Sequence, residues 1–189
     1  MGEHHNPRQL ARLERRIARY LAKMEKVKNY ELAKSSVDGE EIREWLEAKC
    51  KGLGVGLDVC CGYFPITEDA IGVDSDISVV GTDYAIVADA LTPVRDTELD
   101  YVVTNYFDAF SNPVSVLQEW SRVLKSGGLL AISCANADMY DNLDGPLSNR
   151  RRSMAYTEKT ISQLIYRCGF LDVKVEKHKK NLMVTARKV

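Results

Sequence analysis

The stretch that most constrains the fold runs from Val55 to Asp74 and reads VGLDVCCGYFPITEDAIGVD. Its first apolar run, Val55–Val59, contains one acid, Asp58, and is followed by a glycine-containing turn at 60–62. A second apolar run begins at Ala70 and ends on an acid. An open α/β sheet builds a nucleoside site in this order, because the turn presents backbone N–H groups and the acid accepts hydrogen bonds from ribose hydroxyls. The stretch therefore predicts a nucleoside-binding α/β sheet.

The composition is that of an ordinary globular protein, with 45% apolar and 28% charged residues among 189. The formal net charge of −1 gives no general attraction to nucleic acid or to anionic membranes. No apolar run approaches the ~18 residues of a membrane-spanning helix, and the charged N-terminus has no apolar signal core. The five cysteines have no C-x-x-C spacing. We therefore expect reduced thiols, no metal centre and a cytoplasmic location.

The N-terminal part of the chain is expected to form a helical extension or cap, residues 1–51, ahead of a main domain at 52–189. Residues 8–34 carry an apolar stripe at helical spacing, with arginines and lysines on the other faces. The stripe consists of Leu10, Leu13, Ile17, Tyr20, Met24 and Val27. It can pack on the main domain, pair with a second subunit in a homodimer or cover a ligand, and the basic face leaves RNA binding open. A further helix is predicted at 38–49.

The connections between the first strands are too short for a standard α/β sheet. Only eight residues separate Gly62 from Ile71, whereas a βαβ crossover needs about 10–12 residues or more. The segment after Asp74, SDISVVGTDY, is also short and rich in β-branched residues. We therefore predict a trimmed sheet whose early crossovers are loops.

The remaining apolar runs predict the rest of the sheet. Further strands are expected at 85–88, 99–105, 129–133, 173–176 and 182–186. A helix opens at Pro113, a residue that the first helical turn tolerates, and another is capped by Thr157. The apolar face of the Pro113 helix is expected to contain Val114, Leu117, Trp120, Val123 and Leu124. The order of elements favours an α/β fold with a mostly parallel sheet and a C-terminal antiparallel hairpin.

The segment Leu57–Pro65, LDVCCGYFP, resembles motif I of class I S-adenosylmethionine (SAM)-dependent methyltransferases, which reads Gly-Cys-Gly-x-x-Pro in compact members. Cys60 stands in place of the first glycine, and Phe64 stands where many members have the last. A dinucleotide needs those glycines so that its pyrophosphate can approach the backbone. SAM has no phosphate, so the departures count more against NAD than against SAM.

Residues 122–128, RVLKSGG, resemble the Arg-Val-Leu-Lys-Pro-Gly-Gly signature of the same family. Gly127 and Gly128 are expected to supply positive φ angles where the chain turns from a helix into a strand. Motif I, Asp74, Asp89 and this signature occur in the family's order. The chain from 54 to 189 therefore resembles a compact, type 11-like methyltransferase with a Rossmann-like sheet.

The resemblance implies a SAM site at the carboxyl ends of the first strands. It implies that Asp74 binds the ribose, that Asp89 binds the adenine amino group and that the next backbone N–H, that of Ala90, reaches a ring nitrogen. The complete implied cofactor-binding set is Asp58, Cys60, Cys61, Gly62, Asp74, Ser75, Asp89, Ala90 and Asn105.

The residues expected near the methyl acceptor match the family pattern less well. Residues 107–109, Phe-Asp-Ala, stand where many members have Leu-Glu-His, so the general-base role of that histidine cannot be carried over. Tyr106 and Asp108 are the catalytic candidates near the acceptor. The resemblance suggests Tyr30 as an aromatic near the ligand, and Arg150 lies where members insert a substrate-contacting segment.

These features predict an enzyme that transfers the SAM methyl group to a nucleophile, with a small molecule as the first choice of acceptor and RNA or protein as the second. A non-catalytic SAM-binding regulatory or structural subunit is the alternative, because the histidine and the motif I glycines are missing. An NAD-dependent oxidoreductase is disfavoured by the Cys60-Cys61-Gly62 turn and by the RVLKSGG signature.

Overall fold

The structure, a computed structural model, describes residues 37–62, 66–67, 70–74, 84–85, 94–140 and 153–189. The chain divides into two compact units, residues 1–40 and 41–189. The strands are β1 (Gly56–Val59), β2 (Ala70–Asp74), β3 (Tyr84–Ala85), β4 (Leu99–Thr104), β5 (Leu124–Ala135), β6 (Phe170–His178) and β7 (Asn181–Lys188). The described helices are α2 (Val37–Cys50), α3 (Pro113–Val123), α5 (Glu158–Arg167) and the short 3-10 helices η1 (Phe107–Ala109) and η2 (Ala137–Met139).

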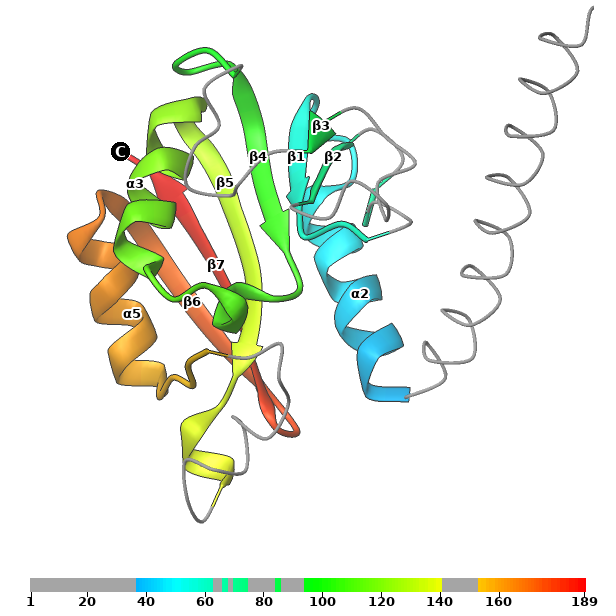
Figure 1. Cartoon of the computed structure of the whole chain (residues 1–189), viewed down its shortest axis with the longest axis vertical. Helices are drawn as coiled ribbons and strands as arrows, with labels where there is room; N and C mark the ends of the chain where they lie inside the picture. The colour runs from blue at the N-terminus through cyan, green and yellow to red at the C-terminus, as the bar shows by residue number, and fades with distance from the viewer. Residues whose placement is uncertain (1–36, 63–65, 68–69, 75–83, 86–93, 141–152) are drawn as a thin grey trace, which may run out of the picture. The chain divides into compact units, whose positions relative to one another are not determined.

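The strands form one seven-stranded sheet in the order β3-β2-β1-β4-β5-β7-β6 (Figure 1). The five strands from β3 to β5 pair in parallel, with β1 between β2 and β4. β7 then runs antiparallel between β5 and β6. This confirms the predicted mostly parallel sheet with a C-terminal antiparallel hairpin. It also places the carboxyl ends of β1, β2 and β4 at one edge, where open α/β sheets bind ligands.

The early connections of the sheet are short. Residues 60–69 join β1 to β2, and residues 75–83 join β2 to β3. Neither segment has room for an ordinary crossover helix with its loops. The described residues of the first connection, 60–62 and 66–67, form no helix. The prediction of shortened crossovers therefore holds for the residues that the structure describes.

β5 begins earlier than its apolar run predicted, directly after α3 at Leu124. It passes through Gly127, whose φ of 75° is the positive value expected. Gly128 was expected to share that conformation but has no positive φ. A Cβ atom at Gly128 would instead lie 2.8 Å from the carbonyl oxygen of Lys125. Glycine is therefore needed at position 128 because the backbone of Lys125 lies too close for a side chain, and not because the position has a left-handed φ.

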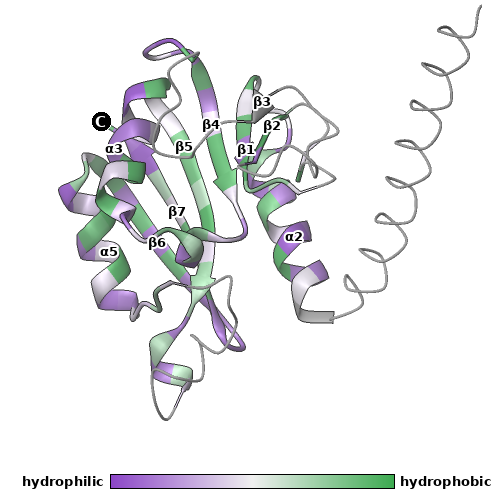
Figure 2. Ribbon diagram, viewed as in Figure 1, coloured by the Kyte–Doolittle hydropathy of each residue, from purple (hydrophilic) through white to green (hydrophobic). Residues whose placement is uncertain are grey.

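β5 also shows how the two faces of the sheet are covered. Leu130 and Ile132 belong to the apolar cluster that includes residues of α3 and α5, whereas Leu129 and Ala131 belong to the cluster under α2. Successive residues of a strand point to opposite faces. Thus α3 and α5 cover one face and α2 covers the other (Figure 1). Figure 2 shows apolar residues along the strands that separate these layers.

The inward face of α3 differs from the predicted one. Asn112 caps the helix, and Pro113 occupies its first turn. Val116 and Trp120 are buried, but Val114, which was predicted to point inward, is 44% exposed. The buried positions follow one another at spacings of three and four, and that stripe excludes Val114.

α2 lies mainly in the second unit, although the sequence placed it in the N-terminal extension. Ile42, Leu46 and Cys50 are buried in one cluster with Tyr101 of β4. The apolar side of α2 therefore helps to form the core of the sheet. The division of the chain in the structure falls between Glu40 and Glu41, before this packed stretch.

Candidate functional site

The turn after β1 meets the end of β2 at the carboxyl edge of the sheet. The N–H of Cys61 donates to the carbonyl oxygen of Val73 over 3.2 Å. The N–H of Gly62 donates to Oδ2 of Asp74 over 3.1 Å. Two of the residues predicted to bind a nucleoside are thus in direct contact. The charged acceptor at the end of β2 holds the turn in place.

The turn contains two residues in the left-handed region. Gly62 has a φ of 63°, and Cys60 has a φ of 60° although it carries a side chain. A Cβ atom at Gly62 would meet no described atom within 4 Å, so the turn is open on that side. Burial raises the pKa of the Cys60 thiol to about 12, and the nearby carboxylates of Asp74 and Asp58 add to this increase. The thiol is therefore neutral at physiological pH.

We expect Cys60→Val to have a free energy of unfolding about 1–2 kcal/mol below that of Cys60→Gly, because a β-branched side chain is poorly compatible with a left-handed φ. Both variants remove the thiol, and only the variant with a side chain is strained at this φ. Urea denaturation measures the difference. Equal stabilities would contradict the left-handed conformation of this residue.

Asp58 lies in the interior of β1. Its side chain is 1% exposed, and its Oδ2 accepts a hydrogen bond from the N–H of Ile66. Burial raises the pKa of Asp58 to about 7. The hydrogen bond from the Ile66 N–H and the charge of Arg43 lower this pKa, whereas the charge of Asp74 raises it. In the structure this predicted cofactor residue therefore anchors the segment that follows the turn.

The sequence pattern did not reveal two features around Tyr101, of which the first holds this segment. Oγ1 of Thr67 lies 2.5 Å from the hydroxyl oxygen of Tyr101 on β4, within hydrogen-bond distance. A Cβ atom at Gly56 would lie 2.1 Å from the Tyr101 ring, so only glycine fits at that position of β1. Neither Thr67 nor Gly56 belongs to a motif, and their roles depend on a tyrosine far away in the sequence.

The end of β4 lies beside the turn because β4 pairs with β1. Asn105 and Tyr106, both predicted site residues, are half-buried there. The N–H of Tyr106 donates to Oγ1 of the buried Thr104 over 3.1 Å. This hydroxyl fixes the direction in which the chain leaves β4, and it was not singled out in the sequence because it simply ends an apolar run.

Asp108, which the sequence predicted as a catalytic candidate, is buried in η1. Its side chain is 2% exposed, and Oδ2 accepts a hydrogen bond from the N–H of Ala135 over 2.8 Å. Its carbonyl oxygen accepts the N–H groups of Ser153 and Met154 over 2.7 and 3.1 Å. Asp108 thus joins η1 to the end of β5 and to the chain that leads into α5, which is a structural role.

Several predicted residues lie outside the described part of the chain: Tyr30, Ser75, Asp89, Ala90, Arg150 and the stripe at 8–34. Among the described residues, no group of three His, Cys, Asp or Glu side chains has the arrangement of a metal site. No described helix combines the length and the apolar character needed to cross a membrane.

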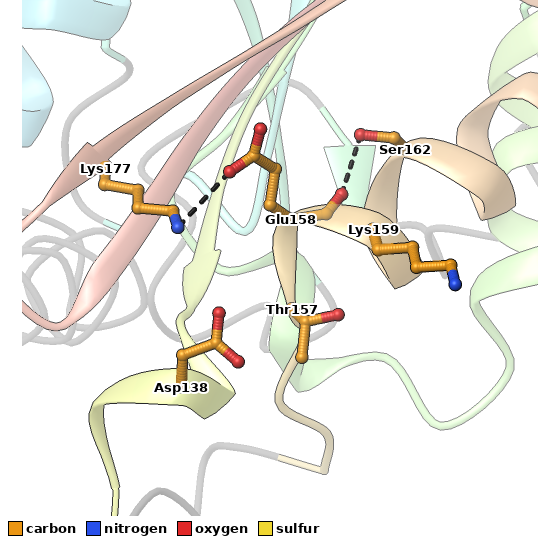
Figure 3. A pocket seen from close by; sticks show the side chains of 6 residues that line it. All are labelled: Asp138, Thr157, Glu158, Lys159, Ser162 and Lys177. Atoms are coloured by element: carbon orange, nitrogen blue, oxygen red, sulfur yellow. Dashed lines mark hydrogen bonds and ion pairs between the residues drawn. The ribbon is translucent and has the colours of Figure 1, made fainter.

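An open pocket lies beside the N-terminus of α5 (Figure 3). Its lining residues are Asp138, Thr157, Glu158, Lys159, Ser162 and Lys177. Nζ of Lys177 lies 3.3 Å from Oε2 of Glu158, and the hydroxyl of Ser162 donates to the carbonyl oxygen of Glu158. None of the predicted site residues that the structure describes lines this pocket.

Comparisons with known proteins agree with this geometry. Residues 41–132 match the family model described as "Methyltransferase domain". The chain is similar in fold to a SAM-dependent methyltransferase from Archaeoglobus fulgidus, with 17% identity, a TM-score of 0.67 and coverage of 84% of this chain and 99% of that one. A sequence comparison with curated proteins gives no match.

Two further structures show the same fold. A possible histamine N-methyltransferase from Thermotoga maritima has 17% identity and a TM-score of 0.66, with coverage of 86% of this chain and 96% of that one. Phosphoethanolamine N-methyltransferase 2 from Haemonchus contortus, solved with SAM, has 13% identity and a TM-score of 0.64. The match covers 79% of this chain and 53% of that one.

The family match over residues 41–132 and the shared fold support the resemblance to class I SAM-dependent methyltransferases that the sequence predicted. They also support S-adenosyl-L-methionine as the cofactor. The sheet order, the turn after β1 and the acid that ends β2 are the parts of this chain on which that resemblance rests.

Proposed function

We propose that the protein transfers the methyl group of SAM to a nucleophilic atom of a small molecule. The observation that carries the proposal is the contact between the Gly62 N–H and the Asp74 carboxylate at the carboxyl edge of the sheet. In an open α/β sheet, that edge is where a nucleoside binds, with its ribose hydroxyls on the acid that ends the second strand.

The described residues at the end of β1 and of β2 are compatible with a bound SAM molecule. The space next to Gly62 admits a ligand close to the backbone, and Asp74 supplies a carboxylate beside it. We assign the ribose to Asp74 and the methionine part to the turn at 60–62, with Asn105 at the neighbouring strand end. Ser75, Asp89 and Ala90 complete the proposed cofactor set, Asp89 and Ala90 at the adenine, beyond the described residues. When bound, SAM supplies an activated methyl group on its sulfonium.

The chain's contribution to this reaction is mainly positional. Methyl transfer is an in-line displacement, so holding the acceptor in line with the methyl group provides much of the rate. A nitrogen or sulfur acceptor needs little help with its proton, whereas a hydroxyl needs a base. We assign Tyr106 to the acceptor contact. Asp108 is reassigned as a positioning residue, because its carboxylate is buried on the Ala135 N–H.

Asp108→Ala is expected to lower the free energy of unfolding by about 1–3 kcal/mol, because the N–H of Ala135 loses its acceptor in the interior. The affinity for S-adenosylhomocysteine (SAH) should change little. Urea denaturation and calorimetric titration measure the two effects. A fully stable variant that still binds SAH but loses methyl transfer would instead restore Asp108 to a catalytic role.

A small-molecule acceptor is supported by two structural neighbours, whose names give histamine and phosphoethanolamine N-methylation, the former as a possible activity. Tyr30 and Arg150 are proposed to contact the acceptor. RNA or protein is the second choice of acceptor. A homodimer formed through the N-terminal helix and a cytoplasmic location also remain proposals.

The test is transfer of a labelled methyl group from SAM to a panel of small amines, thiols and alcohols. We expect turnover of at least one class, and its loss in Asp74→Ala.

A non-catalytic SAM-binding subunit is the second candidate, because Asp108 occupies the position near the absent family histidine and is itself buried. Binding of SAM without turnover of any small molecule, RNA or protein acceptor would favour that candidate.

A further inference from the structure

Asp58 has an oxygen without a hydrogen-bond partner in the protein interior. Its Oδ2 accepts the N–H of Ile66, whereas Oδ1 is buried and has no partner among the described residues. An ionised carboxylate in this position bears a large desolvation cost, and either protonation or a nearby cation relieves it. The side chain is 1% exposed, so solvent does not supply that relief.

The charges around Asp58 act in opposite directions. The titratable and charged groups that interact with it are Arg43 and Cys50 on α2, Cys60 and Cys61 in the turn, and Asp74 on β2. Burial raises the pKa of each of these thiols to about 12, so they stay neutral near pH 7. Arg43 favours the ionised form of Asp58, and Asp74 disfavours it.

The position of Asp58 connects it with the proposed cofactor. One residue, Val59, separates it from the turn, and it interacts electrostatically with Asp74, whose carboxylate binds the turn at Gly62. Burial raises its pKa to about 7 in the ligand-free protein, so its charge changes close to neutrality. A positive charge that enters beside the turn favours the ionised form of Asp58.

We propose that binding of SAM or SAH, each of which carries an ammonium group, ionises Asp58 and releases its proton to solvent. The inference rests on the proposed cofactor site. The neutral carboxyl group loses one proton, no other bond forms or breaks, and the resulting carboxylate is stabilised by the positive charge of the ligand. Both molecules carry an ammonium and a carboxylate, and SAM carries a sulfonium in addition, so SAM, with its net positive charge, couples more strongly.

The first test is calorimetric titration of the full chain with SAH in buffers of different ionisation enthalpy. At about pH 6 we expect release of close to one proton. Because the free form binds a proton that the complex does not, the dissociation constant should rise by about tenfold for each pH unit below 7. Asp58→Asn, which cannot ionise, should bind SAH with no such dependence. Asp138→Asn is the matched control and should keep it.

A second test needs no ligand. The pKa of Asp58 is about 7 in the folded chain, and about 3.9 in an unfolded one. A raised folded pKa adds stability that is complete below the unfolded value and is lost as the pH rises through 7. The melting temperature of the ligand-free protein should therefore fall, relative to that of Asp58→Asn, between about pH 4 and 7 and level off above that range.

The outcomes separate this inference from the proposed function. SAH binding with one proton released at pH 6, and none in Asp58→Asn, supports the inference. SAH binding that is independent of pH, or whose pH dependence persists in Asp58→Asn, overturns the inference and leaves the cofactor site intact. Absence of SAH binding at every pH overturns the cofactor site, and the proton coupling with it.

Discussion

Replacement of Asp74 by Ala is expected to weaken SAH binding by about 1–3 kcal/mol, which corresponds to roughly five- to 150-fold in the dissociation constant. Two losses combine. The ligand loses a charged acceptor for its ribose hydroxyls, and the Gly62 N–H loses the oxygen that it contacts over 3.1 Å. Calorimetric titration of the wild-type chain and the variant measures the change.

Two further variants define the cause of the Asp74 effect. Asp74→Asn keeps an acceptor oxygen for the turn but removes the charge, so its affinity should lie between those of the wild type and Asp74→Ala. Asp138→Ala changes an acid on η2 that is not part of the proposed cofactor set, and it should bind SAH like the wild type. Unchanged affinity in Asp74→Ala would show that the ribose is bound elsewhere.

Trp120→Ala is expected to lower the free energy of unfolding by about 3–5 kcal/mol. The indole is fully buried, and its ring centroid lies 5.9 Å from that of Phe107 and 5.6 Å from that of Phe110. Its removal leaves a cavity between α3 and the sheet. Urea denaturation measures the loss, provided that the variant is compared under conditions where both proteins are folded.

The matched control for Trp120 is Val114→Ala on the same helix. Val114 is 44% exposed, so its truncation should change the stability by no more than about 0.5 kcal/mol. Phe107 lies in η1, next to Tyr106, so the Trp120 cavity should also disturb the acceptor side of the site. A Trp120→Ala protein as stable as the control would contradict the packing of this core.

The strand-turn-strand part of the site could be predicted because its signals are local. The apolar runs, the glycine of the turn and the acid at the end of the second run lie within twenty positions of one another, and parallel pairing brings Gly62 to Asp74. The antiparallel hairpin was predictable for the same reason. Its two apolar runs flank a short polar turn and have no other partner nearby in the sequence.

Other parts of the site depend on contacts between distant residues. Asp108 matches a family position near the acceptor, but the N–H of Ala135 that holds its carboxylate lies on another strand. The same is true of Gly56, whose lack of a side chain makes room for Tyr101. On α3, both Val114 and Val116 are apolar residues near the buried stripe. Packing against the sheet buries Val116 and leaves Val114 exposed.

The most direct measurement is calorimetric titration of the full chain with SAH and, in parallel, with NAD⁺. Binding of SAH in the micromolar range, with no binding of NAD⁺, is the result that the account predicts. It would place the nucleoside site at the turn after β1 once the Asp74→Ala variant is shown to lose it. Binding of NAD⁺ in preference to SAH, or no binding of SAH at all, would contradict the account.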